Sequence, residues 1–595
     1  MKKYSYWILG LILFLTACSG DQEGWTDSGE VISIKSLIDN HVLLKHVDLN
    51  ADTWKFYFES QTVDIPESVI EKVSQDVENW RTTVLFKNQQ SLIIPTLGTR
   101  FEKFIGNIEV NPSRLNPLAA TIQVALPTQG RMKVVVHSKK EAREPNVEHL
   151  FNGYTERQSL AVLGLYPNYN NQVDLIYYDK NGEHERGRAT VTIQTEGFET
   201  RAFQSLRVVT CQPNLMEPGM NLINSPGVGD DDTSVPYMVD ADGEVRWILI
   251  LEQSDLAHSA MQGGVTRLQN GHYLAGNANR NDLLELDVFG NTVKKWNLTA
   301  LGYQYHHEVM QAKNGNFLAT VIKTDAKCMD GITPRINDHI IEFNPETNSL
   351  VHEWDLVNTL DSARNDNVGT LPGMYFGQSN ANWAHNNAIV DWGDDYLATA
   401  RYQGIFKFNK KGGLAWIIAP HKMWREQYKP YLLKPLDKNG NPITDEDVIN
   451  GDKSTDDFDW PWGVHAPAFL PNGHIIAFDN GFFRNFISRP LSDNNQYSRA
   501  VEYEVDEKNR TVRQVWQYGK DRPDCYGPAR SSVQYLPLTK NVLFSSAMQN
   551  KLSNGSYGAH VIEINPSTNK VVYELELSSA VFHRAIRLKL YPETL

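Results

Sequence analysis

A strand, a turn and a second strand recur six times in the C-terminal two thirds of the chain. This repeat limits the possible folds of the chain more than any other feature of its sequence. The copies are YMVDADGEVRWIL (237–249), LLELDVFGNTVKKWNL (283–298), IIEFNPETNSLVHEWDL (340–356), IFKFNKKGGLAWII (405–418), AVEYEVDEKNRTVRQVWQY (500–518) and VIEINPSTNKVVYELEL (561–577). A second hairpin precedes most copies, and two hairpins make a four-stranded sheet, which is the blade of a β-propeller. The repeat therefore predicts an all-β chain with a six-bladed β-propeller over residues 211–595.

Two further segments belong to this expectation. The terminal VFHRAIRLKLY (581–591) predicts the strand that closes the ring, and the charged insertion 420–459 predicts a lid beside the central channel. Upstream, short alternating runs such as KVVVHS (133–138) predict a β-sandwich-like domain over residues 25–210. A helical patch near residues 66–80 is the one departure from strands that we expect there.

The N-terminus, MKKYSYWILGLILFLTACSG, has two lysines, an apolar stretch and a cysteine, as a secretion signal does. Its end resembles the bacterial lipobox, so we expect a signal peptide at 1–17, lipidation of Cys18 and a tether at 18–24. Such a protein is a lipoprotein of the bacterial cell envelope, held at the membrane by its lipid. An ordinary signal peptide with an incidental cysteine is the alternative. The remaining Cys211, Cys328 and Cys525 allow at most one intrachain disulfide.

Composition narrows the partners. A formal net charge of −14 repels phosphate backbones and argues against binding of nucleic acid. Small molecules and neutral surfaces fit this charge better.

Three histidines occupy one position of the repeat. His307, His385 and His465 each lie seven residues before the turn of a first hairpin. Equivalent positions of a propeller are related by rotation about its axis, so the three imidazoles should meet at one mouth of the channel. The same offset gives Gly263 in another repeat, and alignment of Leu536-Pro537 with Leu470-Pro471 gives Ser531 in the last one.

The residue types around these histidines indicate whether the site would bind a metal ion or an anion. Three neutral imidazoles suit Zn²⁺ or Cu²⁺. Arg401 and Asn387 instead favour an anion, because a guanidinium and an amide donor match a sulfate or phosphate group, whereas an arginine repels a cation. We therefore expect an anionic substrate group and no metal cofactor, while a purely structural role of the histidines stays open.

At these residues the chain resembles the bacterial arylsulfate sulfotransferases. The resemblance rests on YHHEVMQAKNGN, WAHNN with the Arg401 strand, FDWPWGVHAPAFLPNGHIIAFDNG, SRAVEYEVDEKNRTVRQVWQYGK and VLGLYPNYNN. It implies a six-bladed propeller behind a sandwich domain, a homodimer, and transfer of a sulfuryl group from a phenolic sulfate ester to a phenol acceptor. No cofactor is implied, because the family does not use the nucleotide sulfate donor.

The resemblance also implies roles for single residues. His465 matches the nucleophile that becomes a transient sulfohistidine in a ping-pong mechanism, while His307, His385, Arg401 and the substrate-binding Asn387 match residues around the sulfate. His307 is preferred over His306 because only His307 shares the repeat offset. We expect Trp383, Trp460, Trp462 and Phe482 either to hold aryl rings or to pack the blades. The competing functions are a ligand-binding propeller without catalysis, a three-histidine metal-dependent hydrolase and a simple sulfatase.

Overall fold

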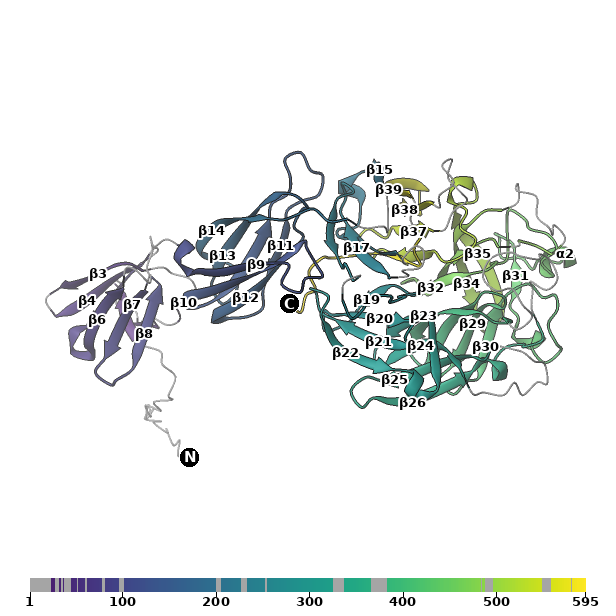
Figure 1. The fold of residues 1–595 in the computed structure, drawn as a ribbon, viewed down its shortest axis with the longest axis horizontal. Coiled ribbons are helices and arrows are strands. Elements are labelled where there is room, and N and C mark those ends of the chain that lie inside the picture. Colours follow the sequence, from purple (N-terminus) through teal and green to yellow (C-terminus); the bar gives the residue numbers. More distant parts are fainter. Residues whose placement is uncertain are drawn as a thin grey trace, which may run out of the picture.

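The computed structural model shows three groups of β-sheets that follow one another along the long axis of the molecule (Figure 1). The described residues are 23–26, 31–33, 36, 44–50, 52–58, 61–76, 81–95, 101–199, 205–225, 233–251, 254–324, 336–364, 382–482, 484–486, 496–547, 558–578 and 581–595. The predicted all-β class is confirmed. The predicted signal peptide and Cys18 lie outside the described residues. Within them, no helix is both long and apolar enough to cross a membrane.

The described part of the first group consists of eight short strands. One sheet has the order β2-β1-β5-β4-β3, with β1 Glu23–Thr26, β2 Val31–Ser33, β3 Leu44–Asn50, β4 Thr53–Phe58 and β5 Thr62–Pro66. The other has the order β6-β7-β8, with β6 Ile70–Asp76, β7 Arg81–Phe86 and β8 Ser91–Pro95. The helical patch expected near 66–80 is wrong, because residues 70–76 pair with β7 as a strand and only residues 67–69 form a 3-10 turn.

The second group is a sandwich joined by one long strand. Its strands are β9 Ile105–Val110, β10 Ala119–Val136, β11 Val147–Leu150, β12 Thr155–Leu163, β13 Asn170–Tyr178 and β14 Glu185–Gln194. The first half of β10 pairs with β9 and β12, and its second half pairs with β11 and β13. The register shifts between Ala125 and Gly130, where β10 passes from one sheet to the other.

The first two groups have separate hydrophobic cores. Residues between Leu44 and Ile94 bury apolar side chains among themselves, whereas the sandwich core begins at Phe101. The region 25–210, treated above as one domain, therefore contains two units. Its C-terminal limit also differs, because β15 (Ser205–Cys211) already pairs with a propeller strand.

Six sheets, antiparallel apart from one edge pair, make up the third group within the described residues. The first two are β40 (Ala585–Leu588) with β16 Met220–Ser225, β17 Val235–Val239 and β18 Val245–Ile248, and then β19 Val265–Arg267, β20 Tyr273–Asn277, β21 Asp282–Leu286 and β22 Thr292–Asn297. The next two are β23 Tyr303–Gln311, β24 Phe317–Lys323, β25 Asp338–Asn344 and β26 Ser349–Asp355, and then β27 Asn386–Trp392, β28 Asp395–Ala400, β29 Gly404–Asn409 and β30 Leu414–Ile418. The last two are β32 His465–Phe469, β33 Ile475–Asp479, β34 Arg499–Asp506 and β35 Thr511–Tyr518, and then β36 Ser532–Tyr535, β37 Val542–Ser546, β38 Gly558–Asn565 and β39 Lys570–Ser578.

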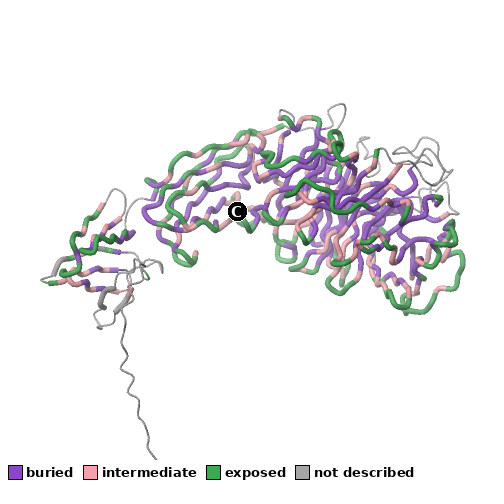
Figure 2. The backbone as a smooth tube through the Cα atoms, turned by 90° about the horizontal axis from the view of Figure 1, so that it is seen from below, coloured by how far each residue is buried: buried purple, intermediate pink, exposed green. Residues whose placement is uncertain are grey.

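These sheets surround a common axis. Residues of β19, β23, β27, β32, β36 and β40, one strand from each sheet, line a single cavity of about 590 Å³. One inner strand per sheet around a shared channel is the arrangement of a β-propeller. Figure 2 shows that buried residues predominate in the interior of this part of the molecule and that exposed ones lie mostly at its periphery.

Two strands from opposite ends of the domain close the ring. The C-terminal β40 pairs with β16 as the inner strand of its sheet, and β15 pairs with β39 on the outside of another. The closing strand predicted from residues 581–591 is thereby found.

The insertion 420–459 does not form the predicted lid. It contains η6 (Lys429–Tyr431), β31 (Lys434–Leu436) and α2 (Glu446–Ile449), and β31 pairs in parallel with β35 at the outer edge of its sheet. The insertion packs there because its apolar side chains, including Trp424, Leu433 and Val448, are buried in the cores of two sheets.

Candidate active site

A cavity of about 210 Å³ lies beside the axis of the propeller. Its lining residues are Gln262, His307, His385, Arg401, His465, Ala529, Arg530 and His583. Four imidazoles and two guanidinium groups thus face one space, and none of the described residues that line it is a carboxylate. Such a pocket is suited to an anionic group.

The histidines are close neighbours. The ring centroids of His307 and His385 are 4.8 Å apart, and His583 lies 6.0 Å from His307 and 6.1 Å from His465. The structure therefore brings together the three imidazoles that share one position of the repeat, together with a fourth that was not predicted.

Irregular strand starts place these side chains. The pairing of β23 with β24 shifts register between Tyr305 and Val309, and His307 has a φ of 53°. His385, directly before β27, has a φ of 55°. Positive φ values are uncommon for side chains of this size and indicate that surrounding structure holds the backbone in place.

Hydrogen bonds fix the orientation of the His465 ring. Its Nδ1 lies 2.7 Å from Oδ1 of Asn480 and 2.9 Å from the carbonyl oxygen of Gly463. Both partners are acceptors because the Asn480 Nδ2 itself donates to the carbonyl oxygens of Gly527 and Arg530, at 2.7 and 3.0 Å. Nδ1 therefore carries the proton, and the lone pair of a neutral ring is on Nε2.

Burial keeps this ring neutral. Removal from water, reinforced by the positive charge of Arg401, lowers the pKa of His465 to about 3. Neutral imidazole is the form in which a histidine nitrogen can act as a nucleophile.

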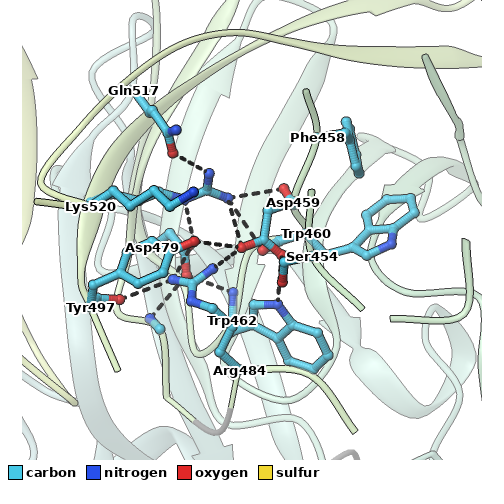
Figure 3. A network of polar contacts seen from close by, with 12 residues as sticks. Ser454, Phe458, Asp459, Trp460, Trp462, Asp479, Arg484, Tyr497, Gln517 and Lys520 are labelled. Carbon is cyan, nitrogen blue, oxygen red and sulfur yellow. Dashed lines mark hydrogen bonds and ion pairs between the residues drawn. The ribbon is translucent and has the colours of Figure 1, made fainter. Parts of the chain in front are cut away.

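A buried ionic network supports this segment of the chain (Figure 3). Arg484 donates to Asp459 at 2.5 Å and to Asp479 at 3.0 Å, while Arg499 donates to Asp479 at 2.7 Å. Asp479 also accepts the backbone N–H of Trp462 at 2.8 Å. The network therefore ties the loop before His465 to the end of β33, which carries Asn480 next to Asp479.

His306 and His307 have different surroundings. Only His307 lines the cavity, whereas His306 points its Nε2 toward Asp338, 3.4 Å away. The two Nδ1 atoms are 2.9 Å apart, so one of them donates to the other. Burial and the neighbouring imidazoles hold the pKa of His307 well below its usual value.

His385 and Arg401 also line the cavity. The Asn382 Nδ2 donates to Nδ1 of His385 at 2.8 Å, which leaves the His385 proton on Nε2. Arg401 donates through Nη2 to the carbonyl oxygen of Pro528 at 3.0 Å, and its guanidinium carbon lies 4.3 Å from the ring centre of Phe482. Burial and Arg401 keep the pKa of His385 well below its usual value.

The amide of Asn387 does not line the cavity. Its Nδ2 donates to the carbonyl oxygen of Val464 at 2.9 Å, and its Oδ1 accepts from the hydroxyl of Thr399 at 2.6 Å. Both ends of this fully buried amide are thus used inside the protein. Asn387 thus holds the residue before His465 in place.

Other expected residues also lie away from the cavity. Ser531 accepts the backbone N–H of Ala547 at 3.0 Å and is buried. Trp383, Trp460 and Trp462 are each 1% exposed and belong to the cores of the sheets. Of the two roles expected for these tryptophans, packing of the blades is therefore the one that the structure supports, while Phe482 lies beside Arg401.

His583 and Arg530 line the cavity although neither was predicted. His583 precedes β40, the inner strand of its sheet, and so occupies the same kind of position as the other three histidines. The offset from a turn could not reveal it, because the chain ends after β40 and the strand that pairs with it lies more than 350 residues earlier, at 220–225. A comparison of strand starts would have found it.

Cys211 and Cys525 are free thiols, and Cys328 lies outside the described residues. Burial raises the pKa of the Cys525 thiol above its usual range. A disulfide between these two cysteines is excluded.

Fold and cavity together define the class: a β-propeller enzyme whose axis holds a buried, cationic and histidine-lined pocket. The profile of the Arylsulfotransferase (ASST) family matches residues 206–586, and that of the Arylsulfotransferase Ig-like domain matches residues 107–196. The chain therefore belongs to the arylsulfotransferase family, and the resemblance found in the sequence is confirmed.

Two relatives of this chain are both named arylsulfate sulfotransferase AssT. The arylsulfate sulfotransferase AssT of Lelliottia amnigena is 29% identical over 563 residues, which cover 80% of this chain and 90% of the relative. The arylsulfate sulfotransferase AssT of Escherichia coli O6:H1 (strain CFT073) is 27% identical over 515 residues, which cover 74% and 84%. This chain is accordingly a sulfotransferase that acts on aryl sulfates.

Proposed function

We propose that this arylsulfotransferase moves a sulfuryl group from a phenolic sulfate ester to a phenol in two displacements, with a sulfohistidine at His465 between them. The observation that carries the proposal is the state of His465. Its Nδ1–H is held by two acceptors, and its Nε2 lone pair belongs to a ring that lines a cationic cavity.

In the first displacement, Nε2 of His465 bonds to sulfur while the ester S–O bond breaks. The electron pair of that bond leaves with the phenol oxygen, which takes a proton as it departs. In the second displacement the oxygen of an acceptor phenol loses its proton, bonds to sulfur and breaks the S–N bond. Donor and acceptor balance all atoms, so the cycle needs no cofactor.

Fixed charges support both steps. Charge spreads over the peripheral oxygens of a sulfuryl group in transfer as it does over those of a phosphoryl group, and oriented cations stabilise it without reorganising. Arg401 and Arg530 supply the cations, and the Nε2–H of His385 supplies a further donor. His307, which lines the cavity and is hydrogen-bonded to His306 through their Nδ1 atoms, gives a proton to the departing phenol oxygen as it takes one from His306, and the acceptor phenol reverses this transfer.

The competing functions fit the cavity less well. Within the described residues, the one group of three or more metal-ligating side chains with mutually close ligand atoms is Asp524, Cys525 and His560, and the cavity histidines do not form such a group. Two arginines in the same lining would also repel a metal ion. A propeller that binds without catalysis would not need a nucleophile whose tautomer is fixed.

Initial-rate kinetics test the two-step cycle. With 4-nitrophenyl sulfate as donor and phenol as acceptor, varied together, double-reciprocal plots should give parallel lines, and added phenol should accelerate release of nitrophenol. Converging lines would contradict the covalent intermediate. Nitrophenol release that is independent of phenol and matched by free sulfate would indicate a sulfatase instead.

The location and assembly of the chain are also part of the proposal. We propose a lipoprotein of the cell envelope, anchored through Cys18 at its membrane and periplasmic or outer-membrane-bound, because the N-terminal sequence ends in Leu15-Thr16-Ala17-Cys18. Fatty-acid labelling and membrane association that both disappear in Cys18→Ser would support this location, and labelling that persists would contradict it. The family resemblance further suggests a homodimer, which a molar mass near that of one chain in solution would exclude.

A further inference from the structure

Two cavities meet at neighbouring residues of the same strands. His307 and His583 line the active-site cavity, while the residues that follow them, Glu308 and Arg584, line the larger channel cavity. The backbone step from one residue to the next thus leads from one cavity to the other on both β23 and the segment that enters β40.

An ion pair joins these two strands. Arg584 donates through Nη1 to Oε1 of Glu308 at 3.1 Å and through Nη2 to Oε2. Glu308 is 2% exposed, and its backbone N–H donates to the hydroxyl of Thr320 at 3.0 Å. The contact is two-pronged, with Glu308 buried and the Arg584 side chain 17% exposed, so both side chains are held in one geometry.

The pair also links blades that are not neighbours. β23 and β40 belong to different sheets, and the sheet β19–β22 lies between them in chain order. A contact across an intervening blade spans the inner end of the propeller instead of sealing one blade against the next. The Glu308–Arg584 ion pair thus lies between the channel cavity and the active-site cavity. We call this ion pair the floor of the active-site cavity.

We propose that the Glu308–Arg584 ion pair is a specificity device that keeps channel water away from the sulfohistidine and so favours transfer to phenol over hydrolysis. This inference rests on the proposed function, because it needs a covalent intermediate at His465. Glu308 and Arg584 are positioning residues here, since they act through the closure of the cavity and the placement of His307 and His583.

The reaction that the floor suppresses is hydrolysis of the sulfohistidine. A water oxygen bonds to sulfur, the S–N bond to His465 breaks, and the products are hydrogen sulfate and free imidazole, with one water proton released. Water competes with phenol for the same sulfur, and enzymes that pass reactive groups between substrates exclude water for this reason. The ratio of free sulfate to transfer product therefore reports how well the floor seals.

The test compares this ratio in four full-length proteins with 4-nitrophenyl sulfate as donor and phenol as acceptor. The double variant Glu308→Leu with Arg584→Met replaces the pair by apolar side chains, a change that is often tolerated in protein interiors. Glu308→Gln keeps the shape of the side chain but removes its charge. Gln311→Leu is the matched control, because Gln311 lines the same channel on β23 three residues beyond Glu308.

We expect the ratio of sulfate to phenyl sulfate to rise roughly tenfold in the double variant and about threefold in Glu308→Gln, since without the ion pair β23 and the segment before β40 are no longer tied together and can part to admit water. Gln311→Leu should match the wild type. An unchanged ratio in a folded double variant that still forms the adduct at His465 overturns the inference, and if that variant does not fold, an unchanged ratio in Glu308→Gln does so. Absence of the adduct in the wild type would instead contradict the proposed function itself.

Discussion

Asn480 decides the state of His465, because its amide can accept from Nδ1 only while its own N–H groups bond to two carbonyl oxygens. The Asn480→Ala variant frees the ring to turn and leaves those carbonyl oxygens unpaired. Loss of a buried hydrogen bond of about 1–3 kcal/mol corresponds to a roughly 5- to 150-fold lower kcat. KM for the aryl sulfate should change little. Asn472→Ala, on the same hairpin but outside the cavity, is the control, and equal losses in both variants would contradict the assigned role.

The low pKa of His465 also makes the protein sensitive to acid. Its folded value of about 3 lies below the ordinary 6.5, so between about pH 6.5 and pH 3 the unfolded chain binds a proton that the folded one does not. The contribution of His465 to the free energy of unfolding is therefore fully present above this pH window and is lost as the pH falls through it. At about pH 5, His465 alone should lower the free energy of unfolding by about 2 kcal/mol relative to neutral pH.

Denaturant unfolding at the two pH values measures this effect. The His465→Gln variant has no imidazole at this position, and its free energy of unfolding should fall less on acidification than that of the wild type. Equal losses in the two proteins would show that His465 titrates normally.

At the scale of elements, the approach of β19 to β23 sets the position of His307. A Cβ atom on Gly263 would lie 2.0 Å from the carbonyl oxygen of His307, so Gly263→Ala must push the β23 backbone away. A displacement of about 1 Å at a catalytic group lowers turnover by about 100-fold. Gly315→Ala is the control, because a Cβ there meets no atom within 4 Å and only the positive φ of 88° is strained. Equal activity of the two variants would contradict this role of Gly263.

The elements also show what the sequence could reveal. Repeated hairpins predicted the propeller, and a shared offset placed His307, His385 and His465 together, because strand periodicity and rotation about an axis are properties of sequence spacing. Side-chain direction near a register shift is not such a property. Asn387 stands two residues beyond His385, but the pairing of β27 is irregular between Asn386 and Ala388, and its amide turns to Val464.

The pairing of β40 with β16 could not be predicted from the sequence for a related reason. β40 meets β16 across most of the domain, and no local turn signal marks such a contact. His583 and Arg584 were therefore missed although the closing strand itself was expected. The separate core of residues 44–94 was missed because alternation predicts strands but not which strands share a core.

At the scale of the whole molecule, the C-terminal residues connect the propeller to the sandwich. The Tyr591 hydroxyl accepts the backbone N–H of Leu163 at 2.7 Å and donates to the carbonyl oxygen of Ala161 at 3.1 Å. The Tyr591→Phe variant leaves a buried N–H unpaired, which should lower the free energy of unfolding by about 1–3 kcal/mol. Calorimetry against Tyr169→Phe, a change of a more exposed ring, checks this, and an unchanged unfolding temperature in Tyr591→Phe would contradict the coupling.

The central claim is that sulfur bonds to Nε2 of His465, and the mass of the intact protein tests this claim most directly. Wild type, His465→Ala and the control His474→Ala, which changes a histidine on the same hairpin, are mixed with an aryl sulfate in the absence of phenol. The account predicts a gain of about 80 Da, the mass of one SO₃ on a covalent nucleophile, in the wild type and the control but not in His465→Ala. Added phenol should discharge it. A wild type that releases phenol from the donor without ever gaining this mass, or an adduct that persists in His465→Ala, would contradict the account.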